Sequence, residues 1–97
     1  MAKLMLYSVY DAKVKYFHNP MFMRNKGEAI RSWQEAANDD KSQICRHPSD
    51  FDLFEMGEFD DQTGSIQMHK TPESIGLAVH FKTAPSQVSD LFSKTAN

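Results

Sequence analysis

The chain has 97 residues, of which 40% are hydrophobic and 25% charged. This balance is typical of one folded domain and excludes a mainly disordered protein. No stretch approaches the roughly 18 apolar residues of a membrane helix, and the first residues lack the features of a secretion signal. We therefore expect one domain with no membrane span, in the cytoplasm where it is made. The single cysteine, Cys45, excludes an internal disulfide.

Charge is distributed unevenly along the chain. The net charge is −2, yet residues 1–47 carry eight Lys and Arg against five Asp and Glu, whereas residues 48–97 carry three against eight. This asymmetry excludes a uniformly basic coat for nucleic acid. Any contact with a phosphate backbone is expected from the first half.

The first third predicts a β-hairpin. Apolar and aromatic residues dominate residues 3–10, and residues 13–18 alternate with a period of two after Asp11 and Ala12. Side chains alternate across a strand, so Lys15 and Phe17 should share one face and Tyr16 the other. Asn19 and Pro20 should end this second strand.

A helix is predicted over about residues 26–38. Asn25 and Glu28 have the spacing of a capping box, and the apolar residues that follow recur at helical intervals. We expect Ile30, Trp33 and Ala37 to face the sheet, while Arg31 and Glu35 lie on the solvent side.

The second half predicts three further strands. Residues 41–50 indicate a loop, residues 51–59 a strand with a bulge at Gly57, and residues 60–64 a hairpin turn into residues 65–69. Pro72 should break the chain before a last strand over residues 75–81. Beyond residue 83 we expect a mobile or short helical tail, with an apolar stripe in residues 86–93 suited to self-association.

Together these elements predict an α+β domain. Its sheet should be mainly antiparallel, with about five strands in the order ββαβββ and one principal helix on one face. The alternative is a barrel like that of oligonucleotide-binding domains, which would require residues 21–24 to form an additional strand before the helix.

Motifs for enzymatic chemistry are missing from the sequence. The four histidines lie in different predicted elements without metal-ligand spacing, no signature surrounds Cys45, and the four glycines form no phosphate-binding loop. Asp52, Glu55 and Glu58 are interpreted as the solvent side of an edge strand. We therefore expect no catalytic activity, no metal and no cofactor.

Basic residues interleaved with aromatic ones form the main candidate site. Single-stranded nucleic acid is bound by this combination, because cations contact phosphates while aromatic rings stack on bases. A small domain also needs aromatic residues for its core, so composition alone leaves both interpretations open. The candidate binding residues are Lys13, Lys15, Arg24, Lys26, Arg31, Tyr10, Tyr16 and Phe17.

The order of four segments resembles a known family: LYSVYDAK at 6–13, GEAIRSWQEAANDDKSQ at 27–43, HPSDFDLFEMGEFDDQTG at 47–64 and TPESIGLAVHFK at 71–82. Together they are similar to the small nonstructural protein of gokushoviruses, which are single-stranded DNA bacteriophages of the Microviridae. The resemblance spans about residues 4–82, and the stretch FxLFxxGEFDDxxG is its most specific part. It implies a role in the infected bacterium, in genome replication or in the switch to single-strand synthesis and packaging, and not in the virion.

Two functions follow as expectations. The first is a non-enzymatic protein that binds single-stranded DNA during phage replication, and a dimer is expected because some apolar surface has no cover within one chain. The second is a protein-interaction module that binds the phage replication initiator, the procapsid or a host factor without contacting DNA. The acidic second half favours a protein partner and the basic first half favours DNA.

Overall fold

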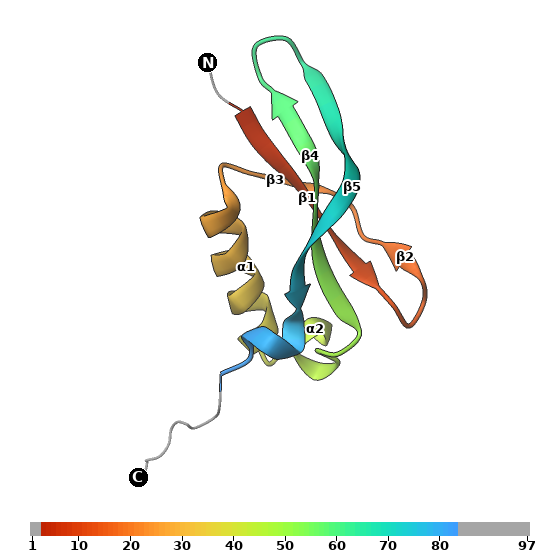
Figure 1. Cartoon of the computed structure of the whole chain (residues 1–97). Coiled ribbons are helices and arrows are strands. Elements are labelled where there is room, and N and C mark those ends of the chain that lie inside the picture. The colour runs from red at the N-terminus through yellow and green to blue at the C-terminus, as the bar shows by residue number, and fades with distance from the viewer. Residues whose placement is uncertain (1–2, 84–97) are drawn as a thin grey trace.

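The computed structural model describes residues 3–83, and they form the predicted α+β architecture (Figure 1). A five-stranded antiparallel sheet carries one main helix on one face, and the sheet does not close into a barrel. The described helices include none long and apolar enough to cross a membrane. The predicted tail, including residues 86–93, lies outside the described residues. The elements are β1 (Lys3–Asp11), β2 (Tyr16–Phe17), β3 (Met21–Met23), α1 (Lys26–Asn38), α2 (Gln43–Arg46), β4 (Phe51–Asp60), β5 (Ser65–Leu77) and the 3₁₀ helix η1 (Ala78–Phe81).

The strand order along the chain differs from the prediction. Three strands precede α1 and two follow it, because residues 21–23 form the short strand β3. The sheet order is β2-β1-β4-β5. β2 pairs with the end of β1 at Tyr10 and Asp11, whereas β3 pairs with β1 at Met5 to Tyr7. The additional strand that a barrel would require is therefore present, but it lengthens one edge of an open sheet.

The predicted second strand over residues 13–18 is wrong in its first half. Asp11 Oδ1 accepts a hydrogen bond from the Lys13 backbone N–H at 2.9 Å, and the Lys15 N–H donates to the Asp11 carbonyl at 2.7 Å. These bonds hold residues 12–15 in a turn, with Lys15 at a φ of 67°. The hydrogen bonds to Asp11 thus replace the backbone bonds that a strand would form at residues 12–15. Only Tyr16 and Phe17 pair with β1.

Helix α1 begins and ends as predicted. The Asn25 side chain accepts from the Glu28 N–H, and the Glu28 carboxylate accepts from the Arg24 N–H. Ala29, Trp33 and Ala37 are buried against the sheet, whereas Ile30 is 36% exposed, so the prediction that Ile30 faces the sheet is wrong. At about 100° per residue, Ala29, Trp33 and Ala37 form a stripe about 80° wide, and Ile30 lies about 60° from its centre, beyond the edge that Ala37 marks.

The predicted bulge at Gly57 is present. Leu6 of β1 is opposite Gly57, while the next residue, Tyr7, is opposite Glu55, so β4 contains one additional residue there. Gly57 also approaches β5 closely: a Cβ atom at this position would lie 2.4 Å from the Gln67 carbonyl oxygen. A side chain at residue 57 therefore has no space unless one of the strands moves.

The last part of the chain departs most from the prediction. β5 continues through Pro72, because this edge strand is irregular between Met68 and Glu73, where no residue pairs with β4. The predicted strand over residues 75–81 ends at Leu77. The chain then turns into η1, where the Val79 N–H donates to the Pro48 carbonyl. The Asn38 side chain fixes the end of η1 by donating to the Phe81 carbonyl and accepting from the Thr83 N–H. The predicted loop over residues 41–50 also contains the short helix α2.

The two faces of the sheet differ in their cover. Within residues 3–83, α1, α2 and η1 lie on one side and enclose a core built around Tyr7, Trp33 and Leu53 (Figure 1). Trp33 Nε1–H donates to the Gly76 carbonyl at 2.9 Å, which ties α1 to β5. We call the opposite side the open face. By strand register it carries Leu4, Leu6, Ser8, Tyr10, Phe17, Phe22, Asp52, Phe54, Phe59, Ile66, Met68 and Ser74.

Candidate nucleic-acid interface

Three aromatic rings form a continuous cluster on the open face. The Tyr10 and Phe17 ring centroids are 4.8 Å apart, and the Phe17 and Phe54 centroids are 5.9 Å apart. We call Tyr10, Phe17 and Phe54 the proximal platform. Phe17 remains 45% exposed. The proximal platform therefore presents aromatic surface to solvent at the β2 edge of the sheet.

The turn between β1 and β2 carries two of the predicted cations. Lys13 and Lys15 are both exposed. Lys13 lines a shallow hollow with Asp11 and Phe51, which belong to the helix-bearing side. Lys15 is the predicted cation closest in sequence to Phe17. Of the two lysines, Lys15 is therefore the better candidate to accompany the platform.

The other three predicted cations lie in a different region. Arg24 precedes α1, Lys26 begins it, and Arg31 lies on its solvent side, as predicted. Figure 1 shows the start of α1 on the opposite side of the sheet from the β1–β2 turn. Lys26 Nζ also forms an ion pair with Glu73 at 2.9 Å. This hydrogen bond raises the pKa of Lys26 above its ordinary value. The eight predicted residues therefore do not form one surface.

Tyr16 lies on the other side of the hairpin from Phe17, as strand alternation predicts. Its ring is 5.9 Å from that of His18, and His18 is in turn 5.8 Å from Phe51. Tyr16 and His18 line an open hollow together with Ile44 of α2. The hairpin thus carries aromatic side chains on both faces, but those of the open face have no helix in front of them.

Phe54, Phe22 and Phe59 are aromatic residues of the open face that were not among the predicted binding residues, although Phe22 belongs to the stretch of interleaved basic and aromatic residues. Phe22 and Phe59 form a second ring pair on the open face, with centroids 5.3 Å apart. The signal was present in β4, where Leu53 and Phe54 are consecutive and must point to opposite faces. Two apolar faces on one strand indicate that the sheet presents apolar surface on both sides.

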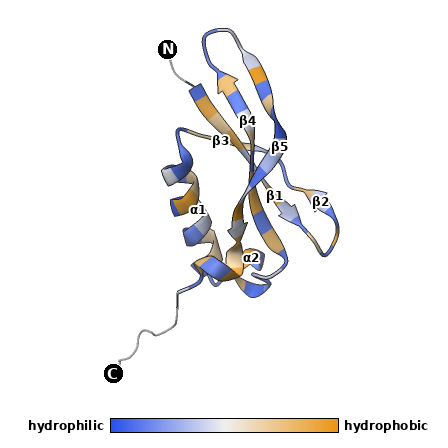
Figure 2. Cartoon of the chain, viewed as in Figure 1, coloured by the Kyte–Doolittle hydropathy of each residue, from blue (hydrophilic) through white to orange (hydrophobic). Residues whose placement is uncertain are grey.

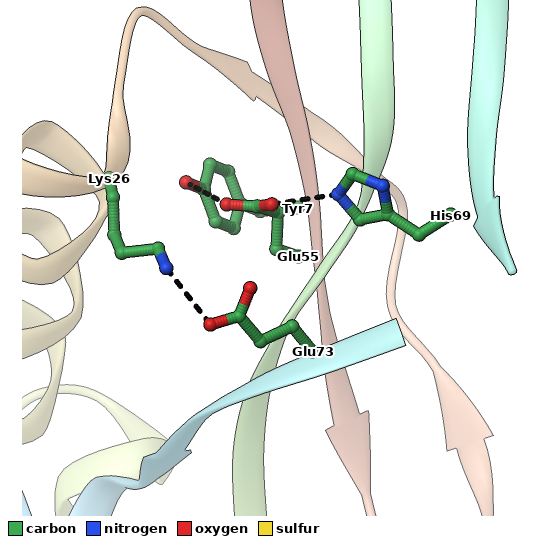
Figure 3. A network of polar contacts seen from close by, with 5 residues as sticks. All are labelled: Tyr7, Lys26, Glu55, His69 and Glu73. Atoms are coloured by element: carbon green, nitrogen blue, oxygen red, sulfur yellow. Dashed lines mark hydrogen bonds and ion pairs between the residues drawn. The ribbon is translucent and has the colours of Figure 1, made fainter. Parts of the chain in front are cut away.

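The acidic residues of β4 do not line a solvent-facing edge, so that interpretation is wrong. β4 lies between β1 and β5, and Glu55 is only 6% exposed. Its Oε1 accepts from the Tyr7 hydroxyl at 3.0 Å, and its Oε2 lies 2.7 Å from His69 Nε2 (Figure 3). Glu58 pairs with Lys3 at 3.3 Å. The bulge in β4 gives this cluster its position, because it brings Glu55 opposite Tyr7.

Both carboxylate oxygens of Glu55 are thus occupied by side chains of the protein. Tyr7 is completely buried, and burial followed by the hydrogen bond to Glu55 raises the pKa of its hydroxyl above the ordinary value of 10.0. A buried carboxylate needs such partners, since an unpaired one would be strongly destabilising. We therefore interpret Tyr7, Glu55 and His69 as a structural network that joins β1, β4 and β5. Residues 3–83 contain no group of three His, Cys, Asp or Glu side chains that could hold a metal ion.

Comparison with known proteins places the chain in a family. Residues 4–81 match the family model described as phage ORF5 protein. The chain belongs to the phage ORF5 protein family. The match covers β1 to η1, and hence the proximal platform, the bulge and the Glu55 network of this ORF5 protein. No curated protein and no solved structure matches the chain.

Proposed function

We propose that this phage ORF5 protein binds single-stranded DNA on the open face of its sheet, at the proximal platform. The observation that carries the proposal is the row of three touching rings, Tyr10, Phe17 and Phe54, with no described helix over it and a lysine turn at its edge. Aromatic rings on a sheet bind bases by stacking, at about 1 to 3 kcal/mol per base.

A preference for single strands follows from this geometry. Bases of a duplex are stacked on one another and offer no free face to a ring, whereas bases of a single strand do. Phe17, with nearly half of its surface exposed, is the ring most available for stacking. Tyr10 and Phe54 support it from β1 and β4.

The charges around the platform define a route for the phosphates. Asp52 is opposite Tyr10 on the open face, and its carboxylate accepts from the Ser74 hydroxyl at 2.9 Å. A phosphate would be repelled there. The strand is therefore expected to follow the β2 edge, where Lys15 provides positive charge.

The biological setting is also a proposal. We propose that the protein belongs to a single-stranded DNA phage of the Microviridae, and the resemblance of its segments to gokushovirus nonstructural proteins supports this. Such a phage exposes single strands during genome replication and packaging, and a stacking platform suits that substrate. We propose that the protein acts without catalysis, without a metal or cofactor, in the cytoplasm of the infected bacterium and outside the virion.

An acidic surface supports a second candidate function. Glu58 and Asp60 lie near the β4–β5 turn, and this end of the hairpin has no cation except Lys3 among the residues that line its hollow. Such a surface suits a basic protein partner, for example the replication initiator, the procapsid or a host factor. A protein-interaction module of this kind would not require DNA binding.

A salt-titrated binding experiment separates the two functions. Fluorescence anisotropy would be measured with labelled single-stranded DNA, duplex DNA and single-stranded RNA over a series of salt concentrations. We expect single-stranded DNA to bind more tightly than duplex, with a modest salt slope because few phosphates are neutralised. Absence of single-strand binding at low salt would refute the proposal and favour the protein-interaction module.

A further inference from the structure

The end of the β4–β5 hairpin is amphipathic although α1 does not cover it. Figure 1 shows this hairpin projecting beyond the start of α1, and Figure 2 shows hydrophobic residues on both of its strands. On the side that α1 would face, the strands carry the polar residues Lys3, Glu58, Asp60 and Gln67. The opposite side is apolar, and we call it the distal patch: Leu4, Phe22, Phe59, Ile66 and Met68.

The distal patch exposes large hydrophobic side chains that are usually buried. Phe22 is 46% exposed, Ile66 51% and Met68 54%. Polar side chains occupy the face that meets water, so a consistent apolar face on the same strands indicates a surface that is buried in the working protein. We propose that a second copy of this chain packs on the distal patch, sheet against sheet, about a two-fold axis.

The chemistry of the patch favours a copy of itself over DNA. None of its five members carries a charge, so a DNA strand would find no partner for its phosphates there. Two apolar patches, in contrast, are complementary without any matching of charges. The acidic residues Glu58 and Asp60 point to the other side and would not meet their copies, and a net charge of −2 per chain gives little repulsion.

The exposed area fits a weak dimer. Side chains of this size present roughly 150 to 200 Å² when fully accessible, so three that are half exposed contribute about 250 to 300 Å² per chain. Two copies would bury about 600 Å² of apolar surface in an interface of about 1,000 Å², because interfaces are roughly 60% apolar. That area is at the lower limit for a specific interface, so we expect a weak association.

Such a dimer would leave both proximal platforms accessible. The near end of the distal patch, at Phe22 and Met68, is level with Leu6, which lies four residues from Tyr10 along β1, or about 13 Å at about 3.3 Å per residue. Overlap of the distal ends alone therefore does not cover Tyr10 or Phe17. Self-association and DNA binding are thus separable in experiment.

Sedimentation velocity of the full-length protein from about 5 to 500 µM tests the proposal. The wild type should shift from monomer to dimer, and Ile66→Glu and Met68→Glu should weaken association by at least about tenfold, because a charge would be buried against apolar surface. Gln67→Glu is the matched control, since it adds the same charge to the opposite face of β5 and should associate as the wild type does. A wild type that stays monomeric, or patch variants that associate like the control, would overturn the proposal.

A second measurement needs no substitution and decides the matter if the glutamate variants fail to fold. In methyl NMR spectra of the wild type, dilution should shift the signal of the Met68 methyl group. The signal of the Met21 methyl group should not change, because Met21 lies on the helix-bearing side. Equal shifts for both methyl groups, or none, would contradict the dimer. A Met68 shift caused by single-stranded DNA in dilute, monomeric protein would instead assign the distal patch to DNA.

Discussion

The rings of Phe17 and Phe54 meet edge to face across β1, with centroids 5.9 Å apart. They come from strands that are not neighbours, since β1 lies between β2 and β4. The two rings can meet because Ser8, the β1 residue opposite Phe54, is small. Its hydroxyl donates to the His18 carbonyl and so lies close to the backbone. A platform of this kind depends on three strands and could not be seen in any single segment of the sequence.

Replacement of Lys15 tests the cationic part of the candidate site. Lys15 has a φ of 67°, a conformation that asparagine tolerates better than alanine, so Lys15→Asn removes the charge with little strain. We expect weaker single-strand binding and a reduction of the salt slope by roughly 0.7, the value for one phosphate contact. The measurement is DNA affinity over a salt series.

Val14→Ala provides the control for Lys15→Asn. Val14 is in the same turn and is 55% exposed, but it has neither charge nor ring. Its affinity and salt slope should equal those of the wild type. An unchanged slope in Lys15→Asn would show that Lys15 does not contact phosphate.

Gly57→Ala tests the bulge. The new methyl group would lie 2.4 Å from the Gln67 carbonyl oxygen and 2.9 Å from Met68 Cα, and both atoms belong to the backbone. We expect a loss of about 1 to 3 kcal/mol in the free energy of unfolding and a Tm lower by roughly 5 to 20 °C. In Gly27→Ala the methyl group would meet only Asn25 Oδ1, at 3.3 Å. Gly27→Ala should therefore leave the free energy of unfolding nearly unchanged. Equal Tm values for the two variants would contradict the register of β4 at Gly57.

Tyr7→Phe tests the buried network. At neutral pH the change leaves the Glu55 carboxylate without one of its two donors, which should destabilise the fold by about 1 to 3 kcal/mol. The folded state raises the pKa of Tyr7, so this contribution is fully present below pH 10.0, the ordinary value, and is lost as the pH rises above it. Denaturant unfolding from pH 8 to about 11 should therefore show a shallower decline for the variant than for the wild type.

Tyr16→Phe is the control for the alkaline experiment, because Tyr16 is 58% exposed and has no part in the network. It should keep the pH dependence of the wild type. The same dependence in Tyr7→Phe would mean that the Tyr7 hydroxyl is not held by Glu55.

Local signals in the sequence predicted much of the fold. The capping residues Asn25 and Glu28 located α1, and the glycine at residue 57 located the bulge, because each feature is marked by a residue type within a short segment. The predictions that were wrong concern residues whose structure is set by contacts far away in the sequence. Residues 78–81 alternate like a strand, yet bonds to Pro48 and Asn38 turn them into η1. The burial of Glu55 likewise could not be predicted, since its partners are 48 and 14 residues away.

The candidate site was predicted only in part. Tyr10 and Phe17 were identified from the mixture of rings and cations, and strand alternation correctly separated Tyr16 from Phe17. Arg24, Lys26 and Arg31 were grouped with them because they are close in sequence. The fold separates them, because β3 crosses to the far end of β1 before α1 begins.

The most direct test of DNA binding at the proximal platform compares two aromatic variants of one hairpin. Single-stranded DNA affinity would be measured for Phe17→Ala and Tyr16→Ala at several salt concentrations, after circular dichroism has shown that both are folded. If the open face binds DNA, Phe17→Ala weakens binding by about 1 to 3 kcal/mol, or roughly 5- to 150-fold, with an unchanged salt slope, while Tyr16→Ala binds as the wild type does. Equal affinities for the wild type and Phe17→Ala, or a loss confined to Tyr16→Ala, would contradict the account.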